Sequence, residues 1–264
     1  MSRTYVVTGA GSGIGAKTRE FLLAAGQNVV GVDIANADVL ADLSTPEGRA
    51  LGSQRAVEAA HGKVDAVIAC AGLAHSTSKT VSVNYFGVTE FLTEILPELS
   101  QSEAPRVAVT SSMASLMPND PALVAAMLAD DEAAAVARAE ELVEAGNGAE
   151  QLIYGSTKRA VSRWIRRVSP TADWAGAGIP INAVGPGIVA TPMTADMIAT
   201  EEARTGLLQV VPMPLHGIMG PEVIAKALIW LTSEDNSHMT GQTIYIDGGS
   251  DVVLRGDNIW DLAQ

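Results

Sequence analysis

The chain has 264 residues, which suffice for one large α/β domain or two small ones with a well-buried core. Hydrophobic residues make up 47% and charged residues 18%, so the composition excludes a disordered or fibrous protein. The formal net charge of −13 disfavours a nucleic-acid-binding protein and leaves only a local basic patch open to that role.

Cysteine usage and hydropathy set the expected compartment. The single cysteine, Cys70, excludes an intrachain disulfide and is typical of a reducing compartment. The chain opens with a strand-like run at Thr4–Thr8 without a signal-peptide pattern. It has no run of about 18 apolar residues that would indicate a membrane span. We therefore expect a cytoplasmic protein that engages neither nucleic acid nor membrane.

Short apolar runs alternate with longer amphipathic segments along most of the chain. Several short runs are rich in Val and Ile without period-two alternation, as in strands buried on both faces. The strand candidates are Tyr5–Val7, Asn28–Val32, Ala37–Ala41, Ala66–Cys70, Arg106–Thr110, Ile179–Ala183 and Thr243–Ile246. The helix candidates are Gly13–Ala25, Pro46–His61, Ser78–Leu99, Gln151–Ala175 and Pro221–Ser233. This alternation predicts right-handed βαβ units and a doubly wound parallel sheet of about seven strands, in one α/β domain over residues 1–264.

One segment, Leu116–Glu150, breaks the alternation because it is rich in Ala, Glu and Asp. Pro118 and Pro121 at its start and Gly146–Gly148 near its end are typical of turns, while Asp131–Ala145 has high helix propensity. We interpret residues 116–150 as a helical insertion of one or two helices, with a disordered acidic loop as the alternative. The helical interpretation rests on an apolar stripe at near-helical spacing, formed by Leu123, Val124, Met127, Leu128, Val136, Leu142 and Val143.

The first strand candidate runs into the glycine-rich segment Thr8–Gly15 and then into a helix. Phosphate can approach backbone N–H groups only where side chains are absent, and the positive end of a helix favours its charge. Here Gly9 permits the tight turn, Gly13 the approach of a pyrophosphate, and Gly15 the packing of helix on strand. The pattern predicts a dinucleotide-binding turn, and a turn without a ligand is the alternative.

A carboxylate, Asp33, follows Gly15 by eighteen residues at the end of the second strand candidate. There it can bind the adenosine ribose hydroxyls of NAD, and it would repel the 2′-phosphate of NADP. No arginine stands at positions 10–16 or 33–36 to bind that phosphate, although Lys17 is close in sequence. We therefore expect NAD as the cofactor; the alternative is that Asp33 is a solvated strand-end residue.

Further segments follow the glycine turn in a fixed order. They are Cys70–Gly72, Asn84–Gly87, Ser111–Ser112, Tyr154–Lys158, Gly185–Thr191 and Asp247–Gly249. Their order and spacing resemble the short-chain dehydrogenase/reductase family over essentially the whole chain. The resemblance implies a Rossmann-type doubly wound parallel sheet, with the helical insertion before the helix that carries Tyr154.

A closer resemblance is to the bacterial 3α-hydroxysteroid dehydrogenase/carbonyl reductase subgroup. It rests on Val30–Ile34, Ala41–Arg49, Val81–Gly87 and Cys70–Gly72, the last standing where most relatives have Asn-Asn-Ala-Gly. That subgroup also carries an insertion between its serine and tyrosine segments, and here Ser112 precedes Tyr154 by 42 positions. Cys70 is thus a trait of the subgroup, and we assign it no redox role.

Tyr154 and Lys158 are four positions apart and share one face of a helix. Exchange of a hydride with a carbinol carbon needs a group that moves a proton to or from the oxygen. Tyrosine, with a reference pKa of about 10, needs a nearby cation for this task, which the Lys158 ammonium can supply. By resemblance, Ser112 and Tyr154 bind the substrate oxygen and Lys158 binds the nicotinamide ribose. By the same resemblance, Asn84 completes this catalytic tetrad by fixing a helix kink and a water. The alternative for Tyr154 and Lys158 is that they are only a pair of residues on the surface of a helix.

The resemblance also implies the contacts with NAD. Asp42 and Leu43 should flank the adenine, and Ala71–Gly72 should pass beneath the adenosine ribose. The nicotinamide should meet Pro186–Val189, with Ile188 and Thr191 near its carboxamide. The cofactor-binding residues so implied are Gly9, Ser12, Gly13, Ile14, Asp33, Asp42, Leu43, Ala71, Gly72, Tyr154, Lys158, Pro186, Gly187, Ile188 and Thr191.

Three remaining features bear on the substrate side. The stretch Thr191–Leu215, rich in Met and Pro, is expected to form a mobile flap over the substrate, with core or an ordered loop as the alternative. The four histidines have no metal-ligand spacing, so we expect no metal. The sequence leaves open whether the tail Val252–Gln264, with Arg255 and Trp260, edges the pocket or a subunit contact.

The leading hypothesis is an NAD-dependent oxidoreductase that interconverts a secondary alcohol and a ketone, with hydroxysteroids or other bulky cyclic carbonyl compounds as candidate substrates. One alternative is an acyl-carrier-protein ketoreductase, poorly matched by Asp33 and the charge of −13. Another is a cofactor-binding protein without turnover. By resemblance the protein is a homo-oligomer. Because the insertion enters beside the Tyr154 helix, which pairs subunits in relatives, we expect a homodimer rather than a homotetramer.

Overall fold

The computed structural model of the protein describes residues 2–257, and their strands form one parallel sheet. The strands are β1 (Thr4–Thr8), β2 (Asn28–Asp33), β3 (Val39–Leu40), β4 (Ala66–Ala69), β5 (Arg106–Thr110), β6 (Ile181–Pro186) and β7 (Thr243–Ile246). Within residues 2–257 the sheet has seven strands in the order β3-β2-β1-β4-β5-β6-β7, and every neighbouring pair is parallel. The predicted doubly wound fold is confirmed.

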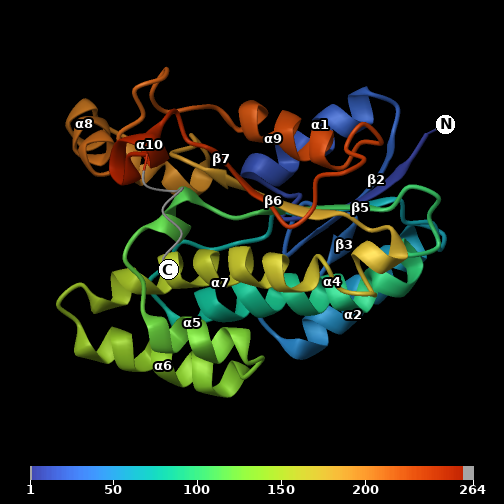
Figure 1. The fold of residues 1–264 in the computed structure, drawn as a ribbon, viewed down its shortest axis with the longest axis horizontal. Helices are drawn as coiled ribbons and strands as arrows, with labels where there is room; N and C mark the ends of the chain where they lie inside the picture. Colours follow the sequence, from blue (N-terminus) through green and yellow to red (C-terminus); the bar gives the residue numbers. More distant parts are fainter. Residues whose placement is uncertain (1, 258–264) are drawn as a thin grey trace.

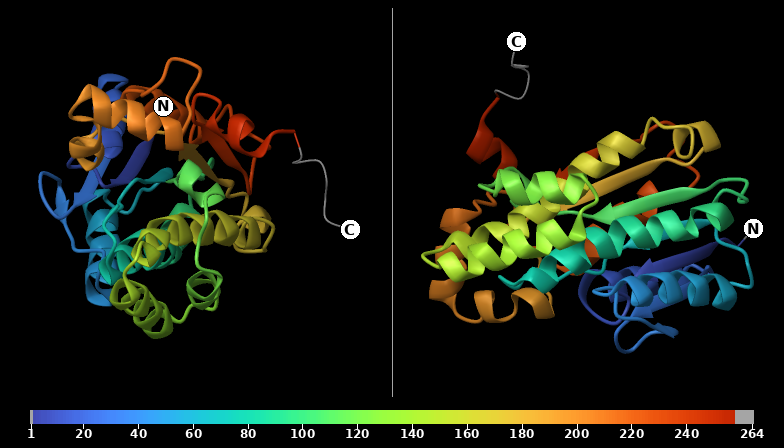
Figure 2. Two further views of the ribbon diagram at one scale, coloured as in Figure 1. Left: turned by 90° about the vertical axis from the view of Figure 1, so that its left-hand side faces the viewer. Right: turned by 90° about the horizontal axis from the view of Figure 1, so that it is seen from below.

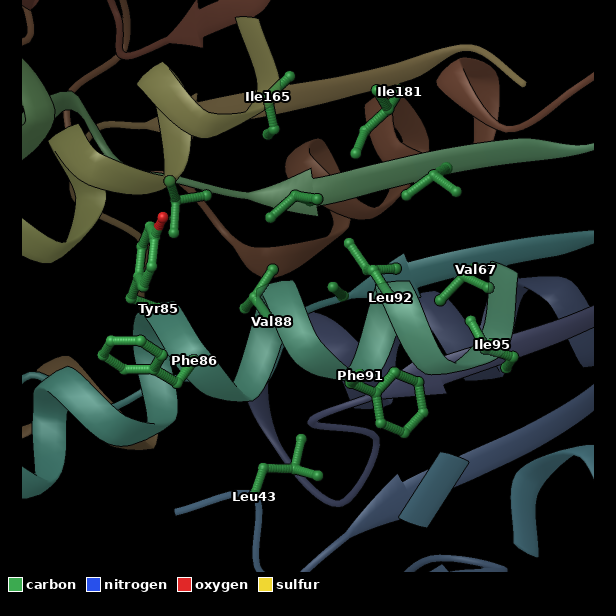
Figure 3. Close-up of a cluster of buried hydrophobic side chains, with 14 of the residues drawn as sticks. Leu43, Val67, Tyr85, Phe86, Val88, Phe91, Leu92, Ile95, Ile165 and Ile181 are labelled. Carbon is green, nitrogen blue, oxygen red and sulfur yellow. The ribbon is translucent and has the colours of Figure 1, made fainter. Parts of the chain in front are cut away.

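Helices cover both faces of the sheet, as Figure 1 shows. On one face lie α1 (Gly13–Ala24) and α9 (Pro221–Leu231); on the other lie α2 (Pro46–Ala59), α4 (Gly87–Leu99) and α7 (Leu152–Val168). Adjacent residues of β1 pack on opposite faces of the sheet. Val6 belongs to the buried hydrophobic cluster on the α4 side, and Val7 belongs to the one on the α1 side. In Figure 3, Leu92 and Ile95 of α4 lie beside Val67 of β4. Burial on both faces explains the apolar runs of the strands.

The insertion folds as two helices outside the α4–α7 layer (Figures 1 and 2). They are α5 (Pro121–Leu128) and α6 (Glu132–Ala145). Each begins after an aspartate whose side chain accepts a hydrogen bond from the backbone in the first turn, Asp120 from Leu123 and Asp131 from Ala134. Their inner faces bury Leu123, Val124, Met127, Ala135, Ala139 and Leu142. The helical interpretation is confirmed and the disordered alternative is wrong, although Val143 of the expected stripe is exposed.

The helix expected over Ser78–Leu99 is interrupted in its first third. A short helix, α3 (Ser78–Val81), passes into a π-helical turn, η1 (Ser82–Phe86), before α4 begins at Gly87. Single π-helical turns inside helices often mark functional sites, and this one carries Asn84. The irregularity that the resemblance implies at Asn84 is therefore present.

The bounds of two further elements differ from the predicted ones because of prolines. The helix expected over Gln151–Ala175 ends at Val168, since Pro170 has no N–H with which to continue the hydrogen-bond ladder. Strand β6 begins at Ile181 rather than Ile179 because Pro180 lacks an N–H, and it continues to Pro186 alongside β7.

The third strand candidate, Ala37–Ala41, shrinks to Val39–Leu40. Asp38 lies just before the strand, where its carboxylate accepts a hydrogen bond from the N–H of Gly31 and pairs with Arg19. Two helices were not predicted, α8 (Glu201–Val210) and α10 (Ser250–Arg255), and α8 buries no residue. Short 3-10 turns complete the described chain at Met113–Leu116, Ala149–Gln151, Ala175–Ala177, Pro192–Thr194 and Asp196–Ile198.

None of the helices between residues 2 and 257 combines the length and apolar character that a bilayer crossing needs.

Candidate active site

A cavity of about 520 Å³ lies at the carboxyl ends of the parallel strands. Strand order reverses between β1 and β4, and ligands of open α/β sheets bind in the crevice at such a point. Most of the predicted site residues line this cavity: Gly9, Ser12, Gly13, Ile14, Asp33, Asp42, Leu43, Ala71, Gly72, Ser112, Tyr154, Lys158, Pro186, Gly187 and Thr191. Asn84 and Ile188 do not line it. Ligand pockets are typically of this size.

The glycine turn leaves room where a phosphate would lie. Gly9 has a φ of +68°, and a Cβ there would stand 2.7 Å from the backbone N of Ala71. A Cβ on Gly15 would stand 2.1 Å from the carbonyl oxygen of Gly9, so this glycine permits the close packing of α1 on β1. A Cβ on Gly13 would meet only Thr191, at 3.4 Å, and would fill space beside the cavity. The turn therefore fits a dinucleotide pyrophosphate at the start of α1.

Asp33 stands at the cavity wall with its carboxylate fixed by backbone donors. Its Oδ2 accepts a hydrogen bond from the N–H of Gly11 at 2.9 Å, and its Oδ1 accepts one from Ile34 at 2.6 Å. The rival cation, Lys17, does not line the cavity and instead pairs with Glu20 at 2.6 Å. The carboxylate of Asp33 is thus held at the cavity, while the ammonium of Lys17 is paired with Glu20 outside it.

At the other end of the cavity, α7 brings Tyr154 and Lys158 together. The Nζ of Lys158 lies 5.8 Å from the centroid of the Tyr154 ring and donates a hydrogen bond to the carbonyl of Thr110 at 2.9 Å. Burial lowers the pKa of Lys158 to about 8. Burial raises the pKa of the Tyr154 phenol, and the neighbouring Ser112 hydroxyl acts in the opposite direction. A largely buried ammonium group is therefore present beside a phenol at the cavity wall.

Ser112 follows β5 and opens the 3-10 turn at Met113–Leu116, where its Oγ accepts a hydrogen bond from Ala114 at 3.1 Å. This turn is braced from α7 and from β7. Arg159 donates to the carbonyl oxygens of Ser115 at 2.7 Å and Met117 at 3.2 Å. The hydroxyl of Tyr245 lies 2.9 Å from that of Ser115. Ser112 thus projects from a backbone that two neighbouring elements hold in place.

Asn84 lies behind the cavity wall and is fully buried. Its Oδ1 accepts a hydrogen bond from the N–H of Leu73 at 2.7 Å, and its Nδ2 donates to Leu73 O at 2.9 Å and Thr157 Oγ1 at 3.1 Å. A Cβ on Gly72 would stand 3.3 Å from Asn84 Oδ1 and 3.6 Å from Lys158 Nζ. Asn84 and Lys158 therefore both lie close to Gly72.

Ile188 was expected near the nicotinamide carboxamide; its side chain is buried and is not among the residues that line the cavity. Its N–H donates to the sulfur of Met213 at 3.2 Å, and its carbonyl accepts from Met219 at 3.1 Å. These two bonds fix the backbone of Ile188 to Met213 and Met219. Met213 is itself buried, whereas Met193 and Met197 of the expected flap are exposed.

Sequence reasoning missed Lys79, which lines the cavity and forms an ion pair at 3.3 Å with Asp42. The two residues are far apart in sequence, so no local pattern indicated the contact. Cys70 also lines the cavity and accepts a hydrogen bond from Thr110 Oγ1 at 3.3 Å. Burial raises the pKa of its thiol to about 11, so the thiol stays protonated at neutral pH.

The C-terminal tail and the histidines were also considered as parts of the site. Arg255 pairs with Asp251 within α10, while Trp260 lies outside the described residues. His75 lines the cavity. Across residues 2–257 no group of three or more His, Cys, Asp and Glu side chains is placed to hold a metal ion.

Comparison with known proteins places the chain in a family. Residues 9–251 match the family described as "Enoyl-(Acyl carrier protein) reductase". The chain is 36% identical over 255 residues to the 3-alpha-hydroxysteroid dehydrogenase/carbonyl reductase of Comamonas testosteroni, covering 95% of this chain and 97% of that one.

Solved structures agree with this assignment. The NADH complex of the 3-alpha-hydroxysteroid dehydrogenase from Pseudomonas sp. B-0831 is 35% identical, with a TM-score of 0.87 over 96% of this chain and 99% of that one. ElxO with NADP bound shares the fold, with a TM-score of 0.73 at 21% identity over 95% and 99% of the two chains. The protein belongs to the short-chain dehydrogenase/reductase family of oxidoreductases.

Proposed function

We propose that the protein is an NAD(H)-dependent oxidoreductase that interconverts a secondary alcohol and a ketone, with Tyr154 as the general acid/base. The observation that carries the proposal is the buried Lys158 ammonium beside the Tyr154 phenol. Asp33 and the open glycine turn stand at the other end of the same cavity. Bound NAD(H) supplies the hydride acceptor or donor.

The protein's own residues handle the proton and the oxygen. In the oxidation direction the substrate hydroxyl gives its proton to the Tyr154 phenolate, and in reduction the phenol returns it. The positive charge of Lys158 stabilises that phenolate. Ser112 donates a hydrogen bond to the substrate oxygen. Asn84 acts by holding the Leu73 backbone and the Thr157 side chain, and thus the spacing between α7 and the cavity wall.

The cofactor preference proposed is NAD over NADP. Its support is the carboxylate of Asp33, which accepts two backbone hydrogen bonds at the cavity wall and would face the 2′-phosphate of NADP. The NADH complex of the 35% identical relative agrees with this preference. Asp42 and Leu43 are proposed to flank the adenine, and Pro186, Gly187 and Thr191 to contact the nicotinamide, because all of them line the cavity.

A hydroxysteroid or another bulky cyclic carbonyl compound is the proposed substrate class. The names of two relatives that are 35% and 36% identical over at least 95% of this chain point to it. The exposed side chain of Met193, which lines the cavity, suits an apolar substrate. The acyl-carrier-protein reductase alternative has the family description in its favour, but a net charge of −13 opposes docking of an acidic carrier.

We also propose a single domain, a cytoplasmic location and a homodimer. The insertion supports the homodimer because α5 and α6 cover the outer side of α7, as Figure 2 shows from two directions. A helix face that is covered within the chain is not free to pair with a second copy.

The function is tested by incubating the protein with NAD and a panel of secondary alcohols, including 3α-hydroxysteroids and cyclic terpenoid alcohols, while NADH formation is followed. We expect NADH formation with at least one apolar cyclic alcohol. NADH binding without turnover on any alcohol or ketone would support a cofactor-binding protein instead, and turnover confined to acyl-carrier-protein thioesters would support the ketoreductase.

A further inference from the structure

Arg49, in the first turn of α2, is an arginine without solvent exposure. A buried guanidinium is stable only when its donors are paired. Its Nη2 and Nη1 donate to the two carboxylate oxygens of Glu132 at 2.6 and 2.7 Å. Nη1 also donates to Glu90 at 3.0 Å. Two carboxylates from different helices therefore meet on one buried cation.

The remaining donors of Arg49 reach backbone carbonyls. Nε donates to Leu43 O at 3.0 Å, and Nη2 donates to Ser82 O at 3.2 Å. The guanidinium also lies 5.7 Å from the centroid of the Phe86 ring. Every N–H of the side chain thus has an acceptor, so a shift of any one partner is opposed by the others.

These partners belong to three functional parts of the molecule. Leu43 lines the cavity where the adenine is proposed to bind, and Ser82 is the first residue of the π-helical turn that carries Asn84. Glu132 is the first residue of α6 in the insertion. One side chain thereby connects the insertion with the cavity wall and with the turn behind it.

We propose that Arg49 is a positioning residue through which Glu132 of the insertion holds the cavity wall at Leu43 and so sets the affinity for NAD(H). The inference rests on the proposed function, because it assigns the Leu43 end of the cavity to the cofactor. Glu132 is the stronger of the two carboxylate partners. It binds Arg49 through both oxygens and is 25% exposed, whereas Glu90 uses one oxygen and is 37% exposed.

The connection must act in both directions. If the α6 terminus fixes Leu43 through Arg49, then a ligand that orders Leu43 also stabilises the first turn of α6. This consequence separates a positioning role from simple structural support, since support alone predicts no response of α6 to the cofactor.

The test uses Glu132→Gln, which keeps the shape of the side chain but removes its charge, in the full-length protein. Glu141→Gln is the matched control, because Glu141 is also on α6 but pairs with the more exposed Arg138. NADH affinity is measured by fluorescence titration, and kcat is measured at saturating cofactor. We expect Glu132→Gln to raise the Kd for NADH about 5-fold or more. We expect kcat to change by less than about 2-fold, because Tyr154 and Lys158 are untouched.

Hydrogen exchange supplies the second measurement. In the unaltered protein NADH should slow exchange of the amides at residues 132–136, and in Glu132→Gln this slowing should be lost, while Glu141→Gln keeps it. Arg49→Met should weaken NADH binding further. Where that variant does not fold, the Glu132→Gln result decides alone.

The outcomes separate this inference from the proposed function. Unaltered protein that binds NADH, together with Glu132→Gln that binds it equally well, would overturn the role of Arg49 and leave the proposed function standing. Loss of kcat in Glu132→Gln at unchanged NADH affinity would overturn it too. Unaltered protein that binds no NADH would contradict the proposed function itself, and this inference with it.

Discussion

Lys158 directs its buried ammonium toward the carbonyl of Thr110, 2.9 Å away, and stands 5.8 Å from the centre of the Tyr154 ring. It forms no ion pair with any residue between 2 and 257. A cation held in this way is available to a phenolate. The same burial makes it a source of instability in the cofactor-free protein, because an ammonium loses its hydration there.

The first prediction is that Lys158→Met stabilises the cofactor-free protein while abolishing turnover. The pKa of Lys158 falls from 10.5 to about 8 on folding. Below pH 8 both the folded and unfolded states are protonated and the full penalty applies, whereas between pH 8 and 10.5 it shrinks as the folded state releases its proton. The gain in unfolding free energy should be about 1–3 kcal/mol at pH 7, since burial of the charge is opposed only by one hydrogen bond.

This gain is measured by urea unfolding at several pH values. The gain should decline as pH rises above 8. The control is Lys17→Met, which removes an exposed ion pair and should change the unfolding free energy little. A destabilised Lys158→Met at pH 7 would contradict the prediction.

The second prediction concerns Tyr154→Phe, which removes the proton-transferring hydroxyl and keeps the ring. We expect kcat to fall about 100-fold or more, with NADH affinity little changed. The matched control is Tyr85→Phe, because Tyr85 is buried in the core and does not line the cavity. Steady-state kinetics and NADH titration measure both quantities. Turnover near that of the unaltered enzyme in Tyr154→Phe would refute the mechanism.

The third prediction is a preference for NADH over NADPH of about 100-fold or more in kcat/KM, with Asp33 as its main cause. Asp33→Ala should lose NADH affinity and narrow the preference, and an added Ile34→Arg should narrow it further by offering the phosphate a cation. Lys17→Met is the control and should leave the preference unchanged, because Lys17 is paired with Glu20. Comparable kcat/KM for the two cofactors in the unaltered enzyme would overturn the role of Asp33.

The fourth prediction uses Gly72, which lies close to both Asn84 and Lys158. In Gly72→Ala the new Cβ stands 3.3 Å from Asn84 Oδ1, so Asn84 or the adjacent backbone must shift. We expect kcat to fall about 10-fold, because small displacements of catalytic groups are costly. Gly206→Ala is the control, since a Cβ there meets nothing within 4 Å. Equal kcat for both variants would show that the Asn84–Lys158 spacing has no effect on catalysis.

The fifth prediction is that the protein is a homodimer in solution. The insertion helices α5 and α6 cover α7, so the α7 face that is expected, by resemblance to relatives, to pair subunits is occupied by the chain itself. Light scattering coupled to size-exclusion chromatography measures the mass. A stable tetramer or a monomer would contradict the prediction.

Local patterns in the sequence determined the parallel sheet, the glycine turn with Asp33 at its side, and the shared helix face of Tyr154 and Lys158. Each depends on short-range rules, namely the apolar run of a buried strand, the steric freedom of glycine and the 3.6-residue helix period. The proline-dependent ends of α7 and β6 obey equally local rules, but they were misplaced because apolar residues continue past Pro170 and precede Pro180.

Only the tertiary structure decided which distant side chains meet. Arg49 and Glu132 are 83 positions apart, and Asp42 and Lys79 are 37 apart, so each contact exists only once helices and loops pack together. The hydrogen bond from the N–H of Ile188 to the sulfur of Met213 likewise joins residues 25 positions apart. The free energy of an ion pair or of a buried cation is set by the partners and by the solvent that packing removes, and neither of these is encoded in local spacing.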